Sequence, residues 1–206
     1  MGLESLSDWV SSLSTAGTLV VAYMAYKKAP EWLNQKMHED ALSIAKKLIF
    51  DDYPSINKVV WKAGGRIHYF TTLYDFISDD LGKLINSDEC DDNLSIFHDI
   101  PNIPITIRDT FSNLTKLGWN VTQEITEINN KIEIHYKGIH KHYVMTWIGI
   151  KKILSEEKPH VKEAYLKTLS KNLESFQYHE KEFDLYYEKL QRSYKRIPHY
   201  FNIEKC

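Results

Sequence analysis

Apolar side chains recur along this chain mostly at intervals of three and four residues, the spacing that places them on one face of an α-helix. The first such stripe predicts a helix that ends near Phe50, because Asp51, Asp52 and Pro54 then interrupt the pattern. A second stripe starts near Pro54 and predicts a helix that continues to Leu84. The N-terminal half therefore favours two long helices separated by a turn.

Glycine and proline residues interrupt the helical pattern in the next part of the chain. The pair Gly64–Gly65 weakens the second helix by about 1 kcal/mol per glycine relative to alanine, so we expect a close crossing or a bend there. Residues 86–104 are acidic and contain two prolines, which predicts a loop with at most a short helical turn at 94–98. Residues 105–118 are expected to form a shorter helix closed by Gly118.

The most regular pattern lies in the C-terminal half. Nine apolar positions from Ile125 to Leu154 keep the helical spacing, and they outweigh the short alternating segment KIEIHY, which taken alone would favour a strand. A last helix is expected from about Pro159 to Ile197, stopped by Pro198. Two such helices joined by a short turn pack as an antiparallel pair. The sequence therefore predicts an all-α protein, an elongated bundle of about four long helices.

The run from Trp9 to Tyr26 has eighteen residues without a charge, followed at once by Lys27 and Lys28. As a helix it would be about 27 Å long, close to the thickness of a bilayer core. We expect a single transmembrane anchor in residues 1–29 with its N-terminus outside, and a cytoplasmic bundle in residues 30–206 at the cell inner membrane. A buried core helix and a helix lying flat on a membrane are the alternatives.

Small residues of the uncharged run share one helical stripe, with a further small pair beside it. Small side chains let helices approach closely in lipid, and hydroxyl groups bond across the contact. We therefore expect the anchors to self-associate into a homo-oligomer, through Ser11, Ser12, Thr15, Ala16, Thr18, Ala22 and Ala25. The alternative is that this stripe arises by chance.

Composition and charge exclude several classes of function. The net charge is −2 and basic residues form no long block, so we expect no direct binding of nucleic acid. The two cysteines, Cys90 and Cys206, are distant in sequence and are typical of a reducing compartment. No phosphate loop, dinucleotide fingerprint or zinc motif occurs, so no cofactor is expected, and the acidic stretches at 79–80 and 88–92 are expected to be solvated.

Three histidines gather in the middle of one predicted helix, close to Glu133. His135, His140 and His142 are offset by five and two residues, whereas ligands on one helix need offsets of three or four. We therefore expect them to point to different faces, and we expect no metal site.

One short motif carries possible chemistry. Arg192 and His199 are separated by six residues, a spacing that resembles the motif of HEPN-type ribonucleases, which are helical bundles. The resemblance implies that the two side chains would meet at a dimer cleft and cut RNA. Physically, a histidine transfers protons and an arginine holds a phosphate. Ser193 and Pro198 depart from the family pattern, and a basic helix end that complements the helix dipole is the alternative interpretation.

The layout of an uncharged N-terminal segment, WVSSLSTAGTLVVAYMAYKKAP, followed by a helical domain resembles small membrane-anchored effectors of bacterial antiphage systems, of the retron-linked or abortive-infection type. The resemblance implies a non-enzymatic effector in antiviral defence. A protein or ribonucleoprotein bound to the bundle would restrain it until infection, after which the anchors would assemble and damage the membrane. A passive membrane scaffold or adaptor and the ribonuclease remain the alternative functions.

Overall fold

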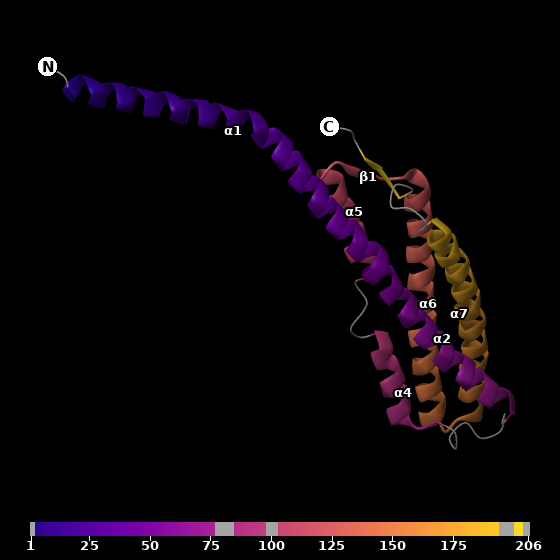
Figure 1. Cartoon of the computed structure of the whole chain (residues 1–206). Coiled ribbons are helices and arrows are strands. Elements are labelled where there is room, and N and C mark those ends of the chain that lie inside the picture. Colours follow the sequence, from indigo (N-terminus) through magenta and orange to yellow (C-terminus); the bar gives the residue numbers. More distant parts are fainter. Residues whose placement is uncertain (1–2, 77–84, 98–102, 194–199, 204–206) are drawn as a thin grey trace.

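The computed structural model describes the backbone of residues 3–76, 85–97, 103–193 and 200–203, and the side chains of 9–72, 85–97, 105–192 and 200–202. Within these residues the chain is almost entirely helical, which confirms the all-α prediction (Figure 1). The elements are α1 Leu3–Lys47, a π-helical segment η1 Leu48–Asp52, α2 Tyr53–Phe76, α4 Ser87–Leu94, a 3₁₀ turn η2 Ser95–Phe97, α5 Ile103–Lys116, β1 Trp119–Val121, α6 Gln123–Ser155, α7 Pro159–Ser193 and β2 Phe201–Ile203.

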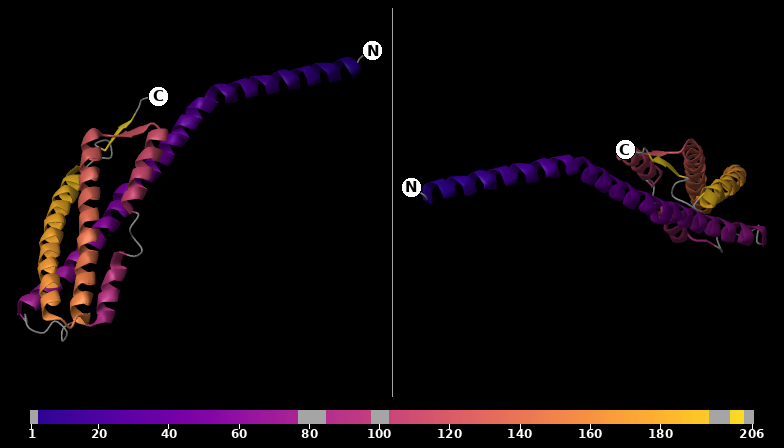
Figure 2. Two further views of the ribbon diagram at one scale, coloured as in Figure 1. Left: turned by 180° about the vertical axis from the view of Figure 1, so that it is seen from behind. Right: turned by 45° about the horizontal axis from the view of Figure 1, so that its top comes forward.

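The first two predicted helices form one continuous helical rod, α1–η1–α2 (Figures 1 and 2). The turn expected at Asp51, Asp52 and Pro54 is therefore wrong. The backbone instead widens to a π-helix, in which the Tyr53 N–H bonds to the carbonyl of Leu48. The wider turn gives room to the proline ring, which in a regular helix would clash with the preceding turn.

The rod is bent within α1, so that its N-terminal part projects away from the bundle (Figures 1 and 2). Pro30 lies inside α1. A proline removes one backbone hydrogen bond and is the usual cause of a kink in a long helix. The first fully buried side chain along the rod is Ala41, which marks where α1 begins to pack on the rest of the protein.

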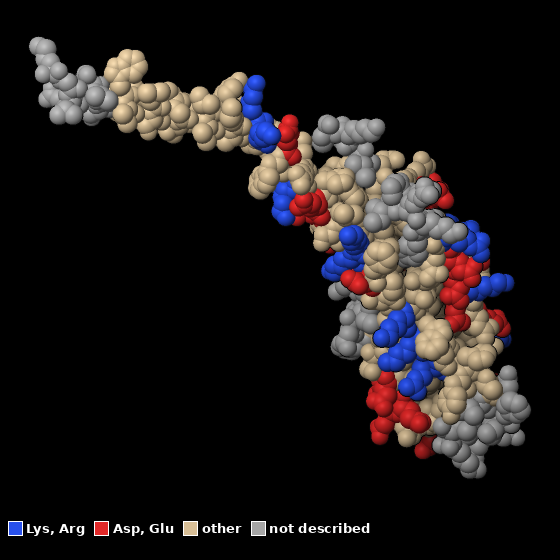
Figure 3. Space-filling view, in the orientation of Figure 1, with Lys and Arg blue, Asp and Glu red and all other residues tan. Residues whose placement is uncertain are grey.

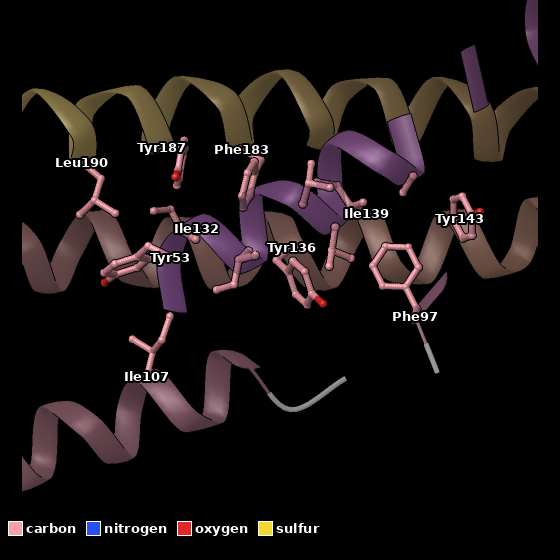
Figure 4. Close-up of a cluster of buried hydrophobic side chains, with 14 of the residues drawn as sticks. Tyr53, Phe97, Ile107, Ile132, Tyr136, Ile139, Tyr143, Phe183, Tyr187 and Leu190 are labelled. Carbon is pink, nitrogen blue, oxygen red and sulfur yellow. The ribbon is translucent and has the colours of Figure 1, made fainter. Parts of the chain in front are cut away.

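The core lies between α6, α7 and the packed half of the rod (Figure 4). α6 and α7 are joined by residues 156–158 and lie side by side along most of their length, which confirms the predicted antiparallel pair. Aromatic side chains dominate their contact, because large rings fill the space between long straight helices. Fully or almost fully buried members of the core include Tyr53, Phe97, Ile107, Ile132, Tyr136, Ile139, Tyr143, Phe176, Phe183 and Leu190.

Three small elements were not predicted: α4, β1 and β2. Within the expected loop, α4 begins at a capping box: the Asn86 side chain accepts from the Glu89 N–H, and the Glu89 carboxylate accepts from the Asn86 N–H. After α5 the chain turns at Gly118, whose φ is +79°, as the expected helix stop requires. β1 then pairs antiparallel with β2. This two-stranded sheet holds the C-terminal segment against the start of α6.

Candidate functional site

The most unusual surface is the projecting part of α1. We call residues 9–36 the arm; every one of them is exposed (Figure 3). The exposure extends around the whole circumference. One side carries a stripe of small and hydroxyl side chains, and large apolar side chains cover the rest. They include Trp9, Val10, Leu13, Leu19, Val20, Val21, Tyr23, Met24 and Tyr26. An exposed apolar surface of this extent is normally covered, either by protein or by lipid. The arm is therefore a candidate binding surface.

The predicted self-association residues all lie on the exposed arm: Ser11, Ser12, Thr15, Ala16, Thr18, Ala22 and Ala25. The Thr15 hydroxyl donates to the carbonyl of Ser11, and the Thr18 hydroxyl donates to the carbonyl of Ser14, both over 2.9 Å. Each threonine thus uses its only hydroxyl proton within its own helix. Its oxygen keeps the capacity to accept a hydrogen bond from another molecule.

No helix in the described part of the chain combines the length and the apolarity that crossing a bilayer requires. The predicted transmembrane span at residues 9–26 is therefore not supported. The five serines and threonines of the run lower its average apolarity.

A second unusual feature is a cluster of three histidines between α6 and α7, which we call the histidine seam: His135, His142 and His179. The Nδ1 atoms of His135 and His179 are 3.1 Å apart, so one donates a hydrogen bond to the other. The rings of His142 and His179 are stacked, with centroids 5.7 Å apart. On the far side, the Nδ1 atom of His142 lies 3.1 Å from the Asn172 Oδ1 atom. His135 also stacks on Tyr186.

The seam corrects the expectation that His135, His140 and His142 point to different faces. His135 and His142 are seven residues apart, which is close to two helical turns, so they share the face that meets α7. Only His140 points elsewhere, against the ring of Phe97. The third member, His179, comes from α7. The seven-residue offset between His135 and His142 could have been recognised in the sequence. The contact with His179 could not, because it depends on how α6 and α7 pack.

Burial lowers the pKa of two histidines of the seam, His135 and His179. For His135 the cause is loss of hydration, partly opposed by the charge of Glu182. For His179 loss of hydration comes first, and positive charge on His135, His142 or Lys141 lowers the pKa further. The pKa of His140 is also lowered by burial. Burial therefore favours the neutral imidazole at His135 and His179, because it disfavours the charged form.

Two glycines let α7 approach its neighbours closely. A Cβ atom at Gly138 would lie 2.5 Å from three atoms of the His179 ring, so the seam needs a glycine there. A Cβ atom at Gly64 on α2 would clash with the carboxylate of Glu180 on α7. The close crossing expected at Gly64–Gly65 is thus present at Gly64. Burial, with the negative charge of Asp184, raises the pKa of Glu180 to about 7.

Glu133 has a structural role away from the seam. Its buried carboxylate accepts hydrogen bonds from Arg108 on α5, over 2.6 and 2.8 Å, and from Lys137 over 2.6 Å. Burial acts to raise its pKa, but the hydrogen bonds from these two cations outweigh burial and lower it. The group fastens α5 to α6. Among the described residues, no set of three or more histidine, cysteine or acidic side chains is arranged to hold a metal ion.

The remaining predicted residues are only partly described. Arg192 is exposed and pairs with Glu188 over 3.3 Å, while His199 lies outside the described residues, so the spacing of the ribonuclease-like pair stays a sequence prediction. In the acidic stretch 88–92, Asp91 forms an ion pair with Lys151. Cys90 is buried, and burial raises the pKa of its thiol. Cys206 and residues 79–80 lie outside the described residues.

Comparisons with protein-family models, with curated proteins and with solved structures found no match to this chain.

Proposed function

We propose that this protein is a non-enzymatic helical protein that attaches to a membrane through its arm and is controlled by a partner bound to its bundle. The observation that carries the proposal is the exposure of an uncharged eighteen-residue run on all sides of the arm. A groove on a single partner would cover only one face of such a helix. Lipid, together with other copies of the arm, covers the whole circumference.

The polar groups of the arm are compatible with an apolar environment. Because Thr15 and Thr18 donate to carbonyls of their own helix, their hydroxyl protons are already satisfied. The end nearest the bundle carries Lys27 and Lys28 with exposed Tyr26. Aromatic rings and cations of this kind favour the interface between lipid and water. The proposed arrangement places the bundle on the side of the lysines.

Self-association of the arms would make the lipid-facing surface smaller and satisfy the hydroxyl groups. In this arrangement the threonine oxygens accept hydrogen bonds and the hydroxyls of Ser11, Ser12 or Ser14 donate them, because the threonine protons are already used. A membrane-damaging effector in antiviral defence, as the layout implies, would act through such an assembly. A passive scaffold would bind the membrane without damaging it.

The test is flotation of the full chain with lipid vesicles, comparing Val20→Asp with Leu33→Asp. The two parent side chains are equally exposed, at 53 % each, and both belong to the arm, but only Val20 lies in the uncharged run. A charge inside a lipid-covered helix costs several kcal/mol, so Val20→Asp is expected to leave the vesicle fraction while Leu33→Asp stays in it. Equal flotation of the two variants would refute attachment through the uncharged run, and no flotation of the parent chain would refute membrane attachment altogether.

Vesicle leakage and membrane potential in expressing cells separate the effector from the scaffold. An effector releases a dye trapped in vesicles and depolarises cells, whereas a scaffold floats with vesicles and does neither. The ribonuclease alternative predicts decay of RNA that Arg192→Ala and His199→Ala abolish. Decay that persists in both variants would end that alternative.

A further inference from the structure

The outer face of α2 carries a row of cations. Residues 53–72 contain no aspartate or glutamate, although the whole chain has a net charge of −2. Lys58, Lys62 and Arg66 are exposed and follow one another at intervals of four residues, so they form one row along the helix. None of the three takes part in a salt bridge with another described residue. The row is spaced by about 6 Å per step.

Two exposed aromatic rings lie in the next row of the same helix. Trp61 is 78 % exposed and Tyr69 is 66 % exposed. They are eight residues apart, or about 12 Å along the helix. Gly65 lies midway between them, and a Cβ atom there would meet nothing within 4 Å. The two rings are therefore separate flat surfaces with bare backbone between them.

We call these two rows together the α2 face: Lys58, Trp61, Lys62, Gly65, Arg66 and Tyr69. Beside it, Lys62, Arg66 and Tyr69 line a hollow of about 310 Å³ between α2 and α4. The opposite wall of the hollow carries Glu89 and Asp92. Figure 3 shows basic side chains on this side of the molecule, next to the acidic side chains of α4. The acidic wall repels an anionic partner from the hollow itself. The cations on the outer side of α2 remain accessible to such a partner.

The composition of the α2 face favours one class of partner. The centre of a protein–protein interface is depleted in lysine and forms a continuous apolar patch. Here Lys58 and Lys62 lie beside Trp61, Arg66 lies beside Tyr69, and an open glycine separates the two rings. Proteins that bind single strands combine a track of cations for the phosphates with isolated aromatic rings on which bases stack. The α2 face has both parts.

We propose that the α2 face binds single-stranded nucleic acid, its cations contacting phosphates and its two rings stacking on bases. The proposal is independent of membrane attachment by the arm. It differs from the expectation, drawn from net charge, of no direct binding to nucleic acid. Net charge averages over the chain, whereas binding depends on the local field of the surface that meets the ligand.

The test measures the anisotropy of a fluorescent oligouridylate of about twelve nucleotides, and of a duplex of equal length, with the full chain in uncharged detergent micelles. The single strand is expected to bind more tightly than the duplex, and more weakly at about 200 mM than at about 50 mM salt. The triple variant Lys58→Ala, Lys62→Ala, Arg66→Ala is expected to weaken binding at least tenfold. Losing three phosphate contacts should also reduce the log–log salt slope by about 2.

A matched control removes three exposed lysines of α7 instead, Lys167, Lys171 and Lys181, and so changes the net charge equally. This control is expected to keep the affinity of the parent chain. Trp61→Ala and Tyr69→Ala are each expected to weaken single-strand binding about fivefold or more.

Two outcomes overturn the proposal. If duplex and single strand bind equally, and removal of either ring changes neither affinity, binding depends on charge alone and the rings do not stack on bases. If the single strand does not bind at low salt, the proposal is refuted, and an acidic protein becomes the favoured partner of the α2 face. Because every substituted side chain is exposed, circular dichroism of the variants should match that of the parent chain, and loss of binding is then a property of the face.

Discussion

Gly138 provides the sharpest test of the histidine seam. Substitution by alanine places a Cβ atom 2.5 Å from three atoms of the His179 ring, closer than packed atoms come. The ring must then move away from α6. Moving it breaks the contact between His135 and His179 and disturbs the stack on His142. Gly138→Ala is therefore expected to destabilise the fold, although alanine is the better helix former.

The expected magnitude follows from three terms. Alanine in place of glycine in a helix interior gains about 1 kcal/mol. Forcing an extra group into a packed interface costs about 1–3 kcal/mol, and loss of the histidine hydrogen bond costs about 1 kcal/mol. The free energy of unfolding should thus fall by about 1–3 kcal/mol.

The matched control is Gly149→Ala, on the same helix and also facing α7. Its Cβ atom would lie 3.9 Å from the Cδ1 atom of Leu169, which is an ordinary contact. Only the gain in helix propensity then applies, so this variant should be about 1 kcal/mol more stable than the parent chain. Urea unfolding followed by far-ultraviolet circular dichroism at pH 7.5 measures both changes.

A double-mutant cycle identifies the ring as the cause. In a His179→Ala background the obstacle is gone, so Gly138→Ala should become stabilising by about 1 kcal/mol. The reasoning about the seam is refuted if Gly138→Ala is as stable as Gly149→Ala, or if it destabilises equally with and without the His179 ring.

Three further predictions concern titration and the arm. Acidification below pH 6.5 should lower the free energy of unfolding of a Glu180→Gln chain, because the lowered pKa values of His135 and His179 mean that the unfolded chain binds more protons there. Urea titrations of this variant at several pH values measure the effect, and a flat profile would contradict it. Glu180 acts in the opposite direction: a pKa raised from 4.5 to about 7 costs stability as pH rises through that window. Because solvent screens this partly exposed carboxyl, the cost is about 1 kcal/mol, and Glu180→Gln should stabilise at pH 8 and not at pH 4. Thr15→Leu with Thr18→Leu should abolish depolarisation of cells while vesicle flotation persists; unchanged depolarisation would exclude a role for the stripe in assembly.

The long helices could be predicted because their apolar stripes are long. The nine positions from Ile125 to Leu154 specify α6 whatever packs on it, and they correctly outweighed the strand-like hexapeptide KIEIHY. The end of α5 at Gly118 followed from local chemistry in the same way. The capping box of Asn86 and Glu89 was equally local and was missed, because the acidic residues around it suggested a loop.

Other features could not be read from local sequence. The short strand β1 pairs with β2, which lies about eighty residues further along the chain, so nothing within either segment specifies the sheet. Pro54 is an ordinary helix stop, and only the π-helical widening that precedes it allows α1 to continue into α2. The partner of His135 and His142 comes from α7, and so the seam appears only when the two helices are placed in register.

The continuity of α1 with α2 bears on how the two proposals fit together. The rod first becomes buried at Ala41, and the Trp119 indole N–H donates to the His38 ring over 3.2 Å just before that point. The arm is thus outside the packed part of the molecule, whereas the α2 face belongs to a helix held against α6 and α7. Lipid around the arm would leave the α2 face uncovered. The bend within α1, the helix that contains Pro30, would then set the angle at which the bundle meets the membrane.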